Sequence, residues 1–179
     1  MDHVNEISNN IEYLYLVKDI LENKDFSKLN NSNHHGISRL EHSMRVSYFS
    51  YKISKFLKLN YVDATRGGLL HDFYFDKENK NFTETVKEAF VHPDKAVIEA
   101  SNHFVINDKQ EDIIKSHMFP YCLYKMTVPK YAESWVVSLV DKSVATYEFV
   151  NTIRYRLSNA SSYLLLFIFL NLVRLQQFS

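Results

Sequence analysis

Glycine and proline are scarce in this sequence, with three residues of each among 179. So few turn residues cannot separate the many short strands of a β-sandwich or barrel. Apolar residues make up 46% of the chain, enough for one sizeable core in a domain of this length. The composition therefore predicts an all-α fold.

The chain has a single cysteine and no net charge. Because Cys122 is the single cysteine, an internal disulfide is excluded, and the first residues lack the basic-then-apolar order of a signal peptide. We therefore expect a cytoplasmic protein. Lys plus Arg and Asp plus Glu each number 21, so no overall charge favours nucleic acid or an acidic membrane as a partner.

No apolar run reaches the roughly 20 residues that a membrane-spanning helix requires. The run 163–173 is interrupted by Asn171. We expect residues 151–179 to form an apolar helix that docks on its own domain or makes a homodimer contact. Since this segment has three arginines and no acidic residue, peripheral contact with a membrane surface is the less favoured alternative.

The rest of the chain divides into two regions. Residues 1–37 are predicted to form a leading helix and a polar linker, both packing on a main domain at residues 38–150. Ser38 and Glu41 have the spacing of a capping box, so a helix is expected to begin there. Along that helix His42 shares the apolar stripe and is predicted to face inward.

A second helix is predicted over residues 62–72. Gly67 and Gly68 weaken such a helix by about 1 kcal/mol each, a cost that is tolerated where another backbone must come close. The charged and aromatic stretch from Phe73 to Val91 shows only weak helix patterns. It is a candidate for part of a substrate rim.

Three more helices complete the predicted domain. Pro93 suits the first position of a helix, which places His92 at its mouth. A capping-box spacing at Asp108 starts a helix that carries His117. Residues 131–150 are apolar on nearly all sides, as expected of a helix through a core.

Asp141 lies within that apolar helix. An ionised carboxylate buried without a partner costs several kcal/mol, so it needs compensation. A metal ion is one solution, and an arginine partner or a cluster of N–H groups is the other. Taken alone, the residue does not decide between them.

Metal-ligand residues recur along the predicted helices. Each histidine alone is more typical of a hydrogen-bonded core residue, but together they favour a metal site. Mixed imidazole and carboxylate ligands suit iron, manganese, cobalt, nickel or zinc, with magnesium as a further candidate. The predicted ligands are His42, His71, Asp72, His92, His117 and Asp141.

Around these residues the sequence resembles the HD superfamily of metal-dependent phosphohydrolases. The similarity covers roughly residues 38–149, through Arg39–Val46, Gly68–Asp72, His92-Pro93, His117 and Val140–Lys142. It implies an orthogonal helical bundle and one or two divalent metal ions. His42, His71, Asp72 and Asp141 correspond to the family's basic metal set, and positions like His92 and His117 complete a second site in its binuclear branch.

The resemblance implies hydrolysis of a phosphomonoester, phosphodiester or nucleotide by a metal-activated water. In this reading Asp72 bridges the ions and orients the water, and His35 or His34, just before the first ligand helix, protonates the leaving group. Arg45, Lys95 and Lys142 lie one to three residues from predicted ligands, so they are the candidate phosphate contacts.

Two other functions remain open. The same order of ligands occurs in di-iron HD-type oxygenases, which sequence spacing does not exclude. A non-catalytic nucleotide-binding HD module is the second alternative, although all six ligand types are present. The sequence carries no Gly-Tyr-Pro motif of the kind found in cyclic-dinucleotide phosphodiesterases of this superfamily.

Overall fold

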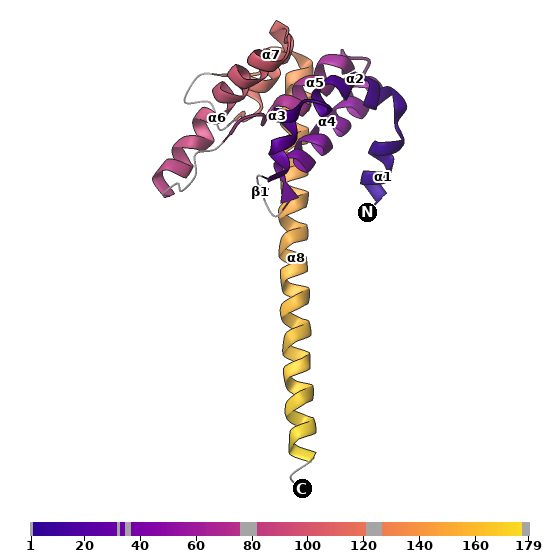
Figure 1. Ribbon diagram of the computed structural model, residues 1–179, viewed down its shortest axis with the longest axis vertical. Coiled ribbons are helices and arrows are strands. Elements are labelled where there is room, and N and C mark those ends of the chain that lie inside the picture. Colours follow the sequence, from indigo (N-terminus) through magenta and orange to yellow (C-terminus); the bar gives the residue numbers. More distant parts are fainter. Residues whose placement is uncertain (1, 32, 35–36, 76–81, 121–126, 177–179) are drawn as a thin grey trace.

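The computed structural model describes the chain except residues 1, 32, 35–36, 76–81, 121–126 and 177–179. The described part is a bundle of helices with one ribbon of two short antiparallel strands (Figure 1). The all-α prediction is confirmed. In chain order the elements are α1 (Asp2–Asn9), α2 (Ile11–Leu21), α3 (Lys24–Ser27), η1 (Lys28–Asn31), β1 (Asn33–His34), β2 (Ile37–Ser38), α4 (Arg39–Phe56), α5 (Tyr61–Leu70), α6 (Phe82–His103), α7 (Asp108–Ser116) and α8 (Ala132–Gln176).

Helix α4 begins where the capping residues predict. The side chain of Ser38 accepts a hydrogen bond from the backbone N–H of Glu41 at 3.1 Å, which satisfies one of the free donors of the first turn. From there α4 presents a buried face that includes His42 and Val46. The inward direction predicted for His42 is confirmed.

The two glycines of α5 lie where neighbouring helices approach closely. A Cβ atom on Gly68 would lie 3.3 Å from the backbone Cα of Ser47 on α4. One on Gly67 would lie 2.7 Å from the side chain of Ile113 on α7. Glycine therefore favours the close packing of α5 between these helices, as predicted, although at Gly67 the neighbour is a side chain.

The N-terminal segment belongs to the core. Tyr13, Val17 and Ile20 of α2 are fully buried in one hydrophobic cluster with residues of α4, α5 and α6. Phe26 and Leu29 lie in the same cluster, within the stretch predicted as a polar linker. That stretch forms α3, η1, β1 and β2 instead, because its few apolar side chains have a core to enter.

Helix α6 differs most from the sequence prediction. It begins at Phe82, so Pro93 is inside the helix and His92 is not at its mouth. A proline removes one N–H from the helical ladder but does not prevent continuation when tertiary packing compensates. Here Ala96 and Ala100 are fully buried beyond the proline.

The start of α7 is one residue earlier than the predicted cap. Asn107, not Asp108, is the N-cap, and its side chain accepts from the N–H of Gln110 at 2.9 Å. Asn107 also donates to Asp63 of α5 at 2.8 Å, a long-range contact that the local pattern does not reveal. The predicted helix is present with a different cap.

Helix α8 has two parts. Near its start Val137, Val140 and Val144 are buried against α4, α5 and α7. Further along, the helix projects away from the bundle, and Ile153 and Leu157 are exposed (Figure 1). The helix therefore does not fold back onto its own domain.

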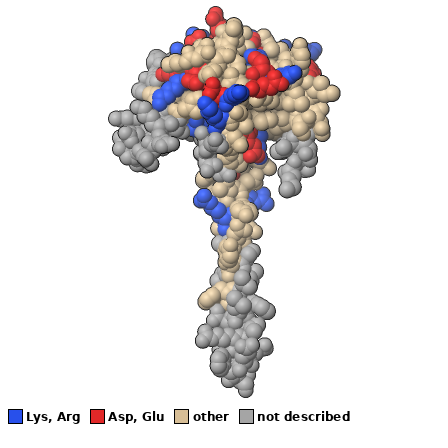
Figure 2. Space-filling model, in the orientation of Figure 1, with Lys and Arg blue, Asp and Glu red and all other residues tan. Residues whose placement is uncertain are grey.

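Charges of both signs are interspersed over the bundle (Figure 2). This agrees with the balanced composition, and the face in view has no large area of one sign. Among the described residues, no helix is both long and apolar enough to span a membrane.

Candidate metal centre

All six predicted ligands meet in the interior of the bundle. They come from α4, from the C-terminal ends of α5 and α7, from the middle of α6, and from α8. His71 and His117 are the C-cap residues of α5 and α7, so the ends of two helices direct their imidazoles to one place. Two overlapping groups of ligand atoms result, with His71 in both.

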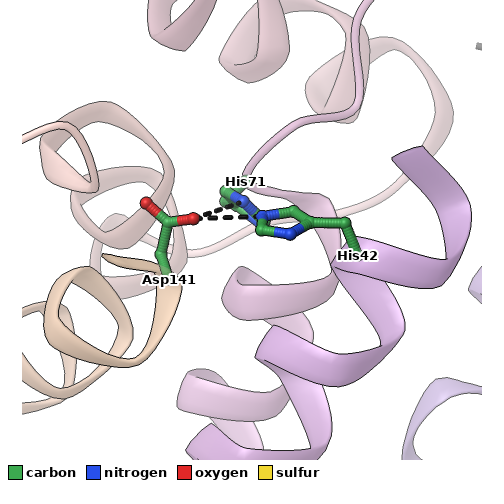
Figure 3. Close-up of side chains that lie close together, drawn as sticks. All are labelled: His42, His71 and Asp141. Carbon is green, nitrogen blue, oxygen red and sulfur yellow. Dashed lines mark hydrogen bonds and ion pairs between the residues drawn. The ribbon is translucent and has the colours of Figure 1, made fainter. Parts of the chain in front are cut away.

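The first group contains His42, His71 and Asp141 (Figure 3). Asp141 Oδ1 lies 3.1 Å from His42 Nε2 and 3.6 Å from His71 Nε2. The side chains come from three different helices and point toward one another. One carboxylate oxygen and two imidazole nitrogens therefore face a common point.

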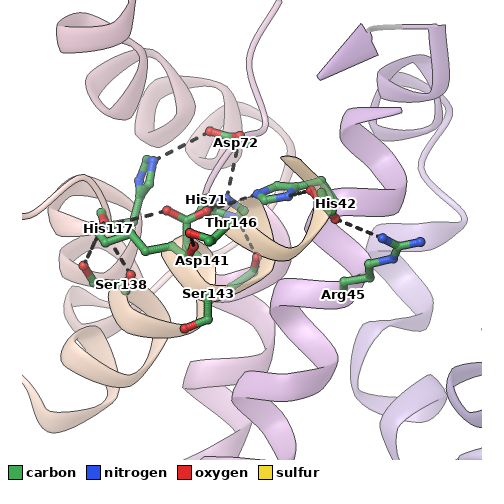
Figure 4. A network of polar contacts seen from close by, with 12 residues as sticks. His42, Arg45, His71, Asp72, His117, Ser138, Asp141, Ser143 and Thr146 are labelled. Atoms are coloured by element: carbon green, nitrogen blue, oxygen red, sulfur yellow. Dashed lines mark hydrogen bonds and ion pairs between the residues drawn. The ribbon is translucent and has the colours of Figure 1, made fainter. Parts of the chain in front are cut away.

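The second group lies around Asp72 (Figure 4). Asp72 Oδ1 is 3.4 Å from His92 Nε2 and 3.7 Å from His117 Nε2, and these two nitrogens are 3.0 Å apart. Asp72 Oδ2 is instead 3.7 Å from His71 Nε2. The two oxygens of Asp72 thus contact different sets of histidines.

Hydrogen bonds on the far side of the rings fix which nitrogen faces the centre. His71 Nδ1 donates to the carbonyl of Gly68 at 2.8 Å, and His117 Nδ1 donates to the carbonyl of Ile114 at 2.7 Å. A carbonyl only accepts, so each Nδ1 carries a proton, and in the neutral ring Nε2 presents a lone pair. This is the tautomer in which an imidazole binds a metal through Nε2.

The protonation of the centre follows from burial and neighbouring charge. Burial, together with the charges of His71 and His92, lowers the pKa of His117 to about 3. Burial alone would also lower the pKa of His42, but contacts with Asp141 and Glu148 raise it to about 10. Burial would raise the pKa of Asp141, yet the facing rings of His42 and His71 hold it well below its usual range.

A divalent cation fits these residues. His71 Nε2 is buried and has no hydrogen-bond partner among the described residues. A buried nitrogen without a partner costs free energy, and a metal ion would satisfy it. The donor set of imidazole nitrogens and carboxylate oxygens is the chemistry that transition-metal ions prefer, so the residues present match the predicted cofactor.

One functional residue was missed by the sequence analysis. Glu148 of α8 is buried, and its Oε2 lies 2.8 Å from His42 Nδ1. Its Oε1 accepts from Arg45 Nη1 at 3.2 Å. The available signal was the spacing of seven residues from Asp141, which places both acids on one face of the helix.

Two of the three predicted phosphate contacts, Arg45 and Lys142, have protein partners in the structure. Arg45 pairs with Glu148 and Glu41. Lys142 Nζ lies 2.7 Å from the carbonyl of His117 and within 3.2 Å of the carbonyl and hydroxyl oxygens of Ser138. Three acceptors match the three hydrogens of an ammonium group, so Lys142 holds the end of α7 in place.

The remaining predicted residues are less defined. Lys95 lies on α6, three residues after His92, and is half-buried. Its role as a phosphate contact stays a prediction. His35 lies outside the described residues.

Comparison with known proteins agrees with this centre. The family model of the HD domain matches residues 39–146, which is more than half of the chain. The chain therefore belongs to the HD domain family. No curated protein and no solved structure matches it. The matched segment contains all six predicted ligands, and two groups among them, His42 with His71 and Asp141, and His71 with Asp72 and His117, could hold a metal ion.

Proposed function

We propose that this HD domain is a metal-dependent phosphohydrolase that acts on a phosphomonoester, phosphodiester or nucleotide. The observation that supports the proposal most directly is the position of Asp72. Its Oδ2 is 3.7 Å from His71 Nε2, and its Oδ1 is 3.4 Å from His92 Nε2. A carboxylate with its two oxygens directed at different imidazoles suits a position between two cations, as in the binuclear branch of the family.

In this proposal Asp72 acts on the water, and His71 and His117 bind the metal ions. Two divalent cations bound here would supply an acidified water molecule and neutralise charge on the phosphoryl oxygens. Asp72 would help to hold the cations and would orient that water by accepting a hydrogen bond from it. The backbone carbonyls of Gly68 and Ile114 keep His71 and His117 in the orientation that presents Nε2.

Differences in burial indicate the side from which substrate approaches. The side chains of His42, His71 and His117 are at most 2% exposed. Those of His92 and Asp141 are 8% and 13% exposed. Substrate would therefore reach the centre beside His92 and Asp141, the more exposed of these side chains.

The substrate is proposed to be a small phosphorylated molecule or nucleotide rather than nucleic acid, because charges of both signs cover the visible face of the bundle (Figure 2). Lys95 is proposed to contact the phosphate, because it lies three residues after the more exposed ligand His92. His35 remains the proposed proton donor to the leaving group.

The test is metal analysis of the purified protein followed by a substrate screen. A generic phosphodiester, mononucleotides and dinucleoside polyphosphates should release product only when divalent metal is supplied. Asp72→Ala should abolish both metal binding and turnover. Asp25→Asn, a change at an exposed carboxylate on α3, is the matched control and should leave both unchanged.

Two results would support the other functions instead. Oxygen consumption with every phosphoester left intact would identify a di-iron HD-type oxygenase. A tight nucleotide complex without turnover under any of these metals would identify a non-catalytic nucleotide-binding module.

A further inference from the structure

His42 differs from His71 and His117 in the group that accepts a hydrogen bond from its Nδ1. His71 and His117 donate to neutral backbone carbonyls within their own helices. His42 Nδ1 instead lies 2.8 Å from a carboxylate oxygen of Glu148, which comes from another helix. A carboxylate is the stronger acceptor, and it makes the imidazole a better electron donor to a metal at Nε2.

Glu148 occupies a costly position. The residue is 3% exposed, and a buried carboxylate is destabilising unless it is fully paired. Its two oxygens contact His42 Nδ1 and Arg45 Nη1, at 2.8 and 3.2 Å. Arg45 also pairs with Glu41 one turn earlier on α4, so the guanidinium is fixed between two carboxylates.

The geometry of α4 and α8 makes this contact possible. His42 and Arg45 are three residues apart on one face of α4, and both contact the same glutamate of α8. On the other side of the His42 ring, Nε2 faces Asp141 at 3.1 Å. The imidazole is therefore clamped between two carboxylates of α8.

We propose that Glu148 is a positioning residue for the metal centre, and that Arg45 holds it in place. In the neutral ring, the form that binds a metal, Glu148 keeps the proton of His42 on Nδ1, which directs the lone pair of Nε2 toward the metal position beside Asp141. Glu148 lies beyond the segment that matches the HD domain family, which ends at residue 146. This inference rests on the metal site of the proposed function but not on the hydrolytic chemistry.

The experiment measures metal affinity directly, by competition with a chromophoric chelator, using manganese, zinc and iron(II) as probes. Glu148→Gln keeps the size of the side chain and removes its charge. We expect a loss of about 10–100-fold in affinity, and a larger loss in Glu148→Ala. Arg45→Met should give a smaller loss, because Glu148 remains but is less firmly held.

Glu133→Gln provides the matched control. Glu133 is another buried glutamate of α8, 5% exposed, and it contacts Asn60 and Lys109 rather than a ligand. Its substitution should lower stability while leaving metal affinity unchanged. A second readout is the NMR spectrum of the zinc-loaded protein, in which the Nδ1 proton of His42 should show the downfield shift of a hydrogen bond to a carboxylate in the wild type and lose that shift in Glu148→Ala.

The outcomes are distinguishable. If Glu148→Gln and Glu148→Ala bind metal as tightly as the wild type, or if Glu133→Gln loses as much affinity, the inference is overturned while the proposed function stands. If the wild type binds metal with the expected dependence on Glu148 but hydrolyses no phosphoester, the proposed function fails and the inference stands. A wild type that binds none of the three metals overturns both.

Discussion

Asp141 and Glu148 lie two turns apart on α8 and contact opposite nitrogens of the His42 ring. Since seven residues of an α-helix complete nearly two full turns, both acids face α4 at once. The orientation of a single imidazole is thus set by one helix, and any rotation of α8 about its axis would move both contacts together.

Because both ligand groups share His71, substitutions at His71 and His92 should remove different amounts of bound metal. His71→Ala removes a ligand from both groups, so bound metal should fall close to zero. His92→Ala affects only the group around Asp72, and a protein that holds two ions should retain one. Metal analysis by mass spectrometry after dialysis gives the stoichiometry. Equal occupancy in both variants would contradict the arrangement of two overlapping sites.

The Glu133 contact predicts a dependence of stability on pH. Burial alone would raise the pKa of Glu133, but hydrogen bonds from Lys109 and from the Asn60 backbone lower it below its ordinary value. A carboxyl whose pKa is lower in the folded state stabilises the fold fully above its unfolded pKa of about 4.3, and this contribution is lost as pH falls through the folded pKa.

Denaturant titrations across this range provide the measurement. Glu133→Gln should be less stable than the wild type by about 1–3 kcal/mol at pH 7, the usual contribution of hydrogen bonds to a charged group. The difference should shrink below about pH 4, because the wild-type carboxyl is then protonated too. A difference that stays constant between pH 7 and pH 3 would show that the charge of Glu133 contributes nothing.

Packing at Gly67 predicts a steric coupling between α5 and α7. An added methyl group would lie 2.7 Å from Ile113 Cγ2, so Gly67→Ala should destabilise the protein by about 1–3 kcal/mol. In the double variant with Ile113→Ala the new methyl fills part of the space left by the isoleucine. The loss in free energy of unfolding should then be smaller than the sum of the single losses, whereas strictly additive losses would contradict direct contact.

The exposed part of α8 allows a direct test of the expected homodimer. Val150, Ile153 and Leu157 recur at steps of three and four residues and are 40–62% exposed. This spacing is typical of the seam by which two like helices pair. We predict that a second copy of the chain covers this stripe. Ile153→Lys combined with Leu157→Lys should shift the mass in light scattering from dimer to monomer.

Tyr155→Lys is the control for that shift. The residue is 70% exposed but lies on the opposite face of the helix, so the dimer should persist. A wild type that is monomeric at all concentrations and floats with anionic vesicles would favour membrane-surface contact instead.

Features set by local sequence were the ones predicted best. The Ser38 cap and the inward face of His42 follow from residues within a few positions of each other. The convergence of six ligands followed from the family resemblance and the order of the helices. The beginning of α6 was predicted wrongly, because Pro93 indicates a helix start, whereas the burial of His92 against Asp72 and His117, just before the proline, is a tertiary effect that the local pattern does not contain.

Glu148 illustrates what sequence alone leaves out. A glutamate in a helix is usually a solvated residue, and neither its burial nor its pairing with Arg45 is encoded nearby. Both depend on how α4 crosses α8. The same crossing gives Arg45 its partner, whereas Lys142 contacts the end of α7 and Ser138 of its own helix, although the positions of both beside predicted ligands suggested phosphate binding.

Helix α8 continues without a break to Gln176, 28 residues beyond Glu148. At about 1.5 Å per residue its far end lies roughly 40 Å from the imidazole of His42. A partner bound there is too distant to touch the six predicted ligands. It could reach them only through α8 itself, the helix that carries Asp141 and Glu148.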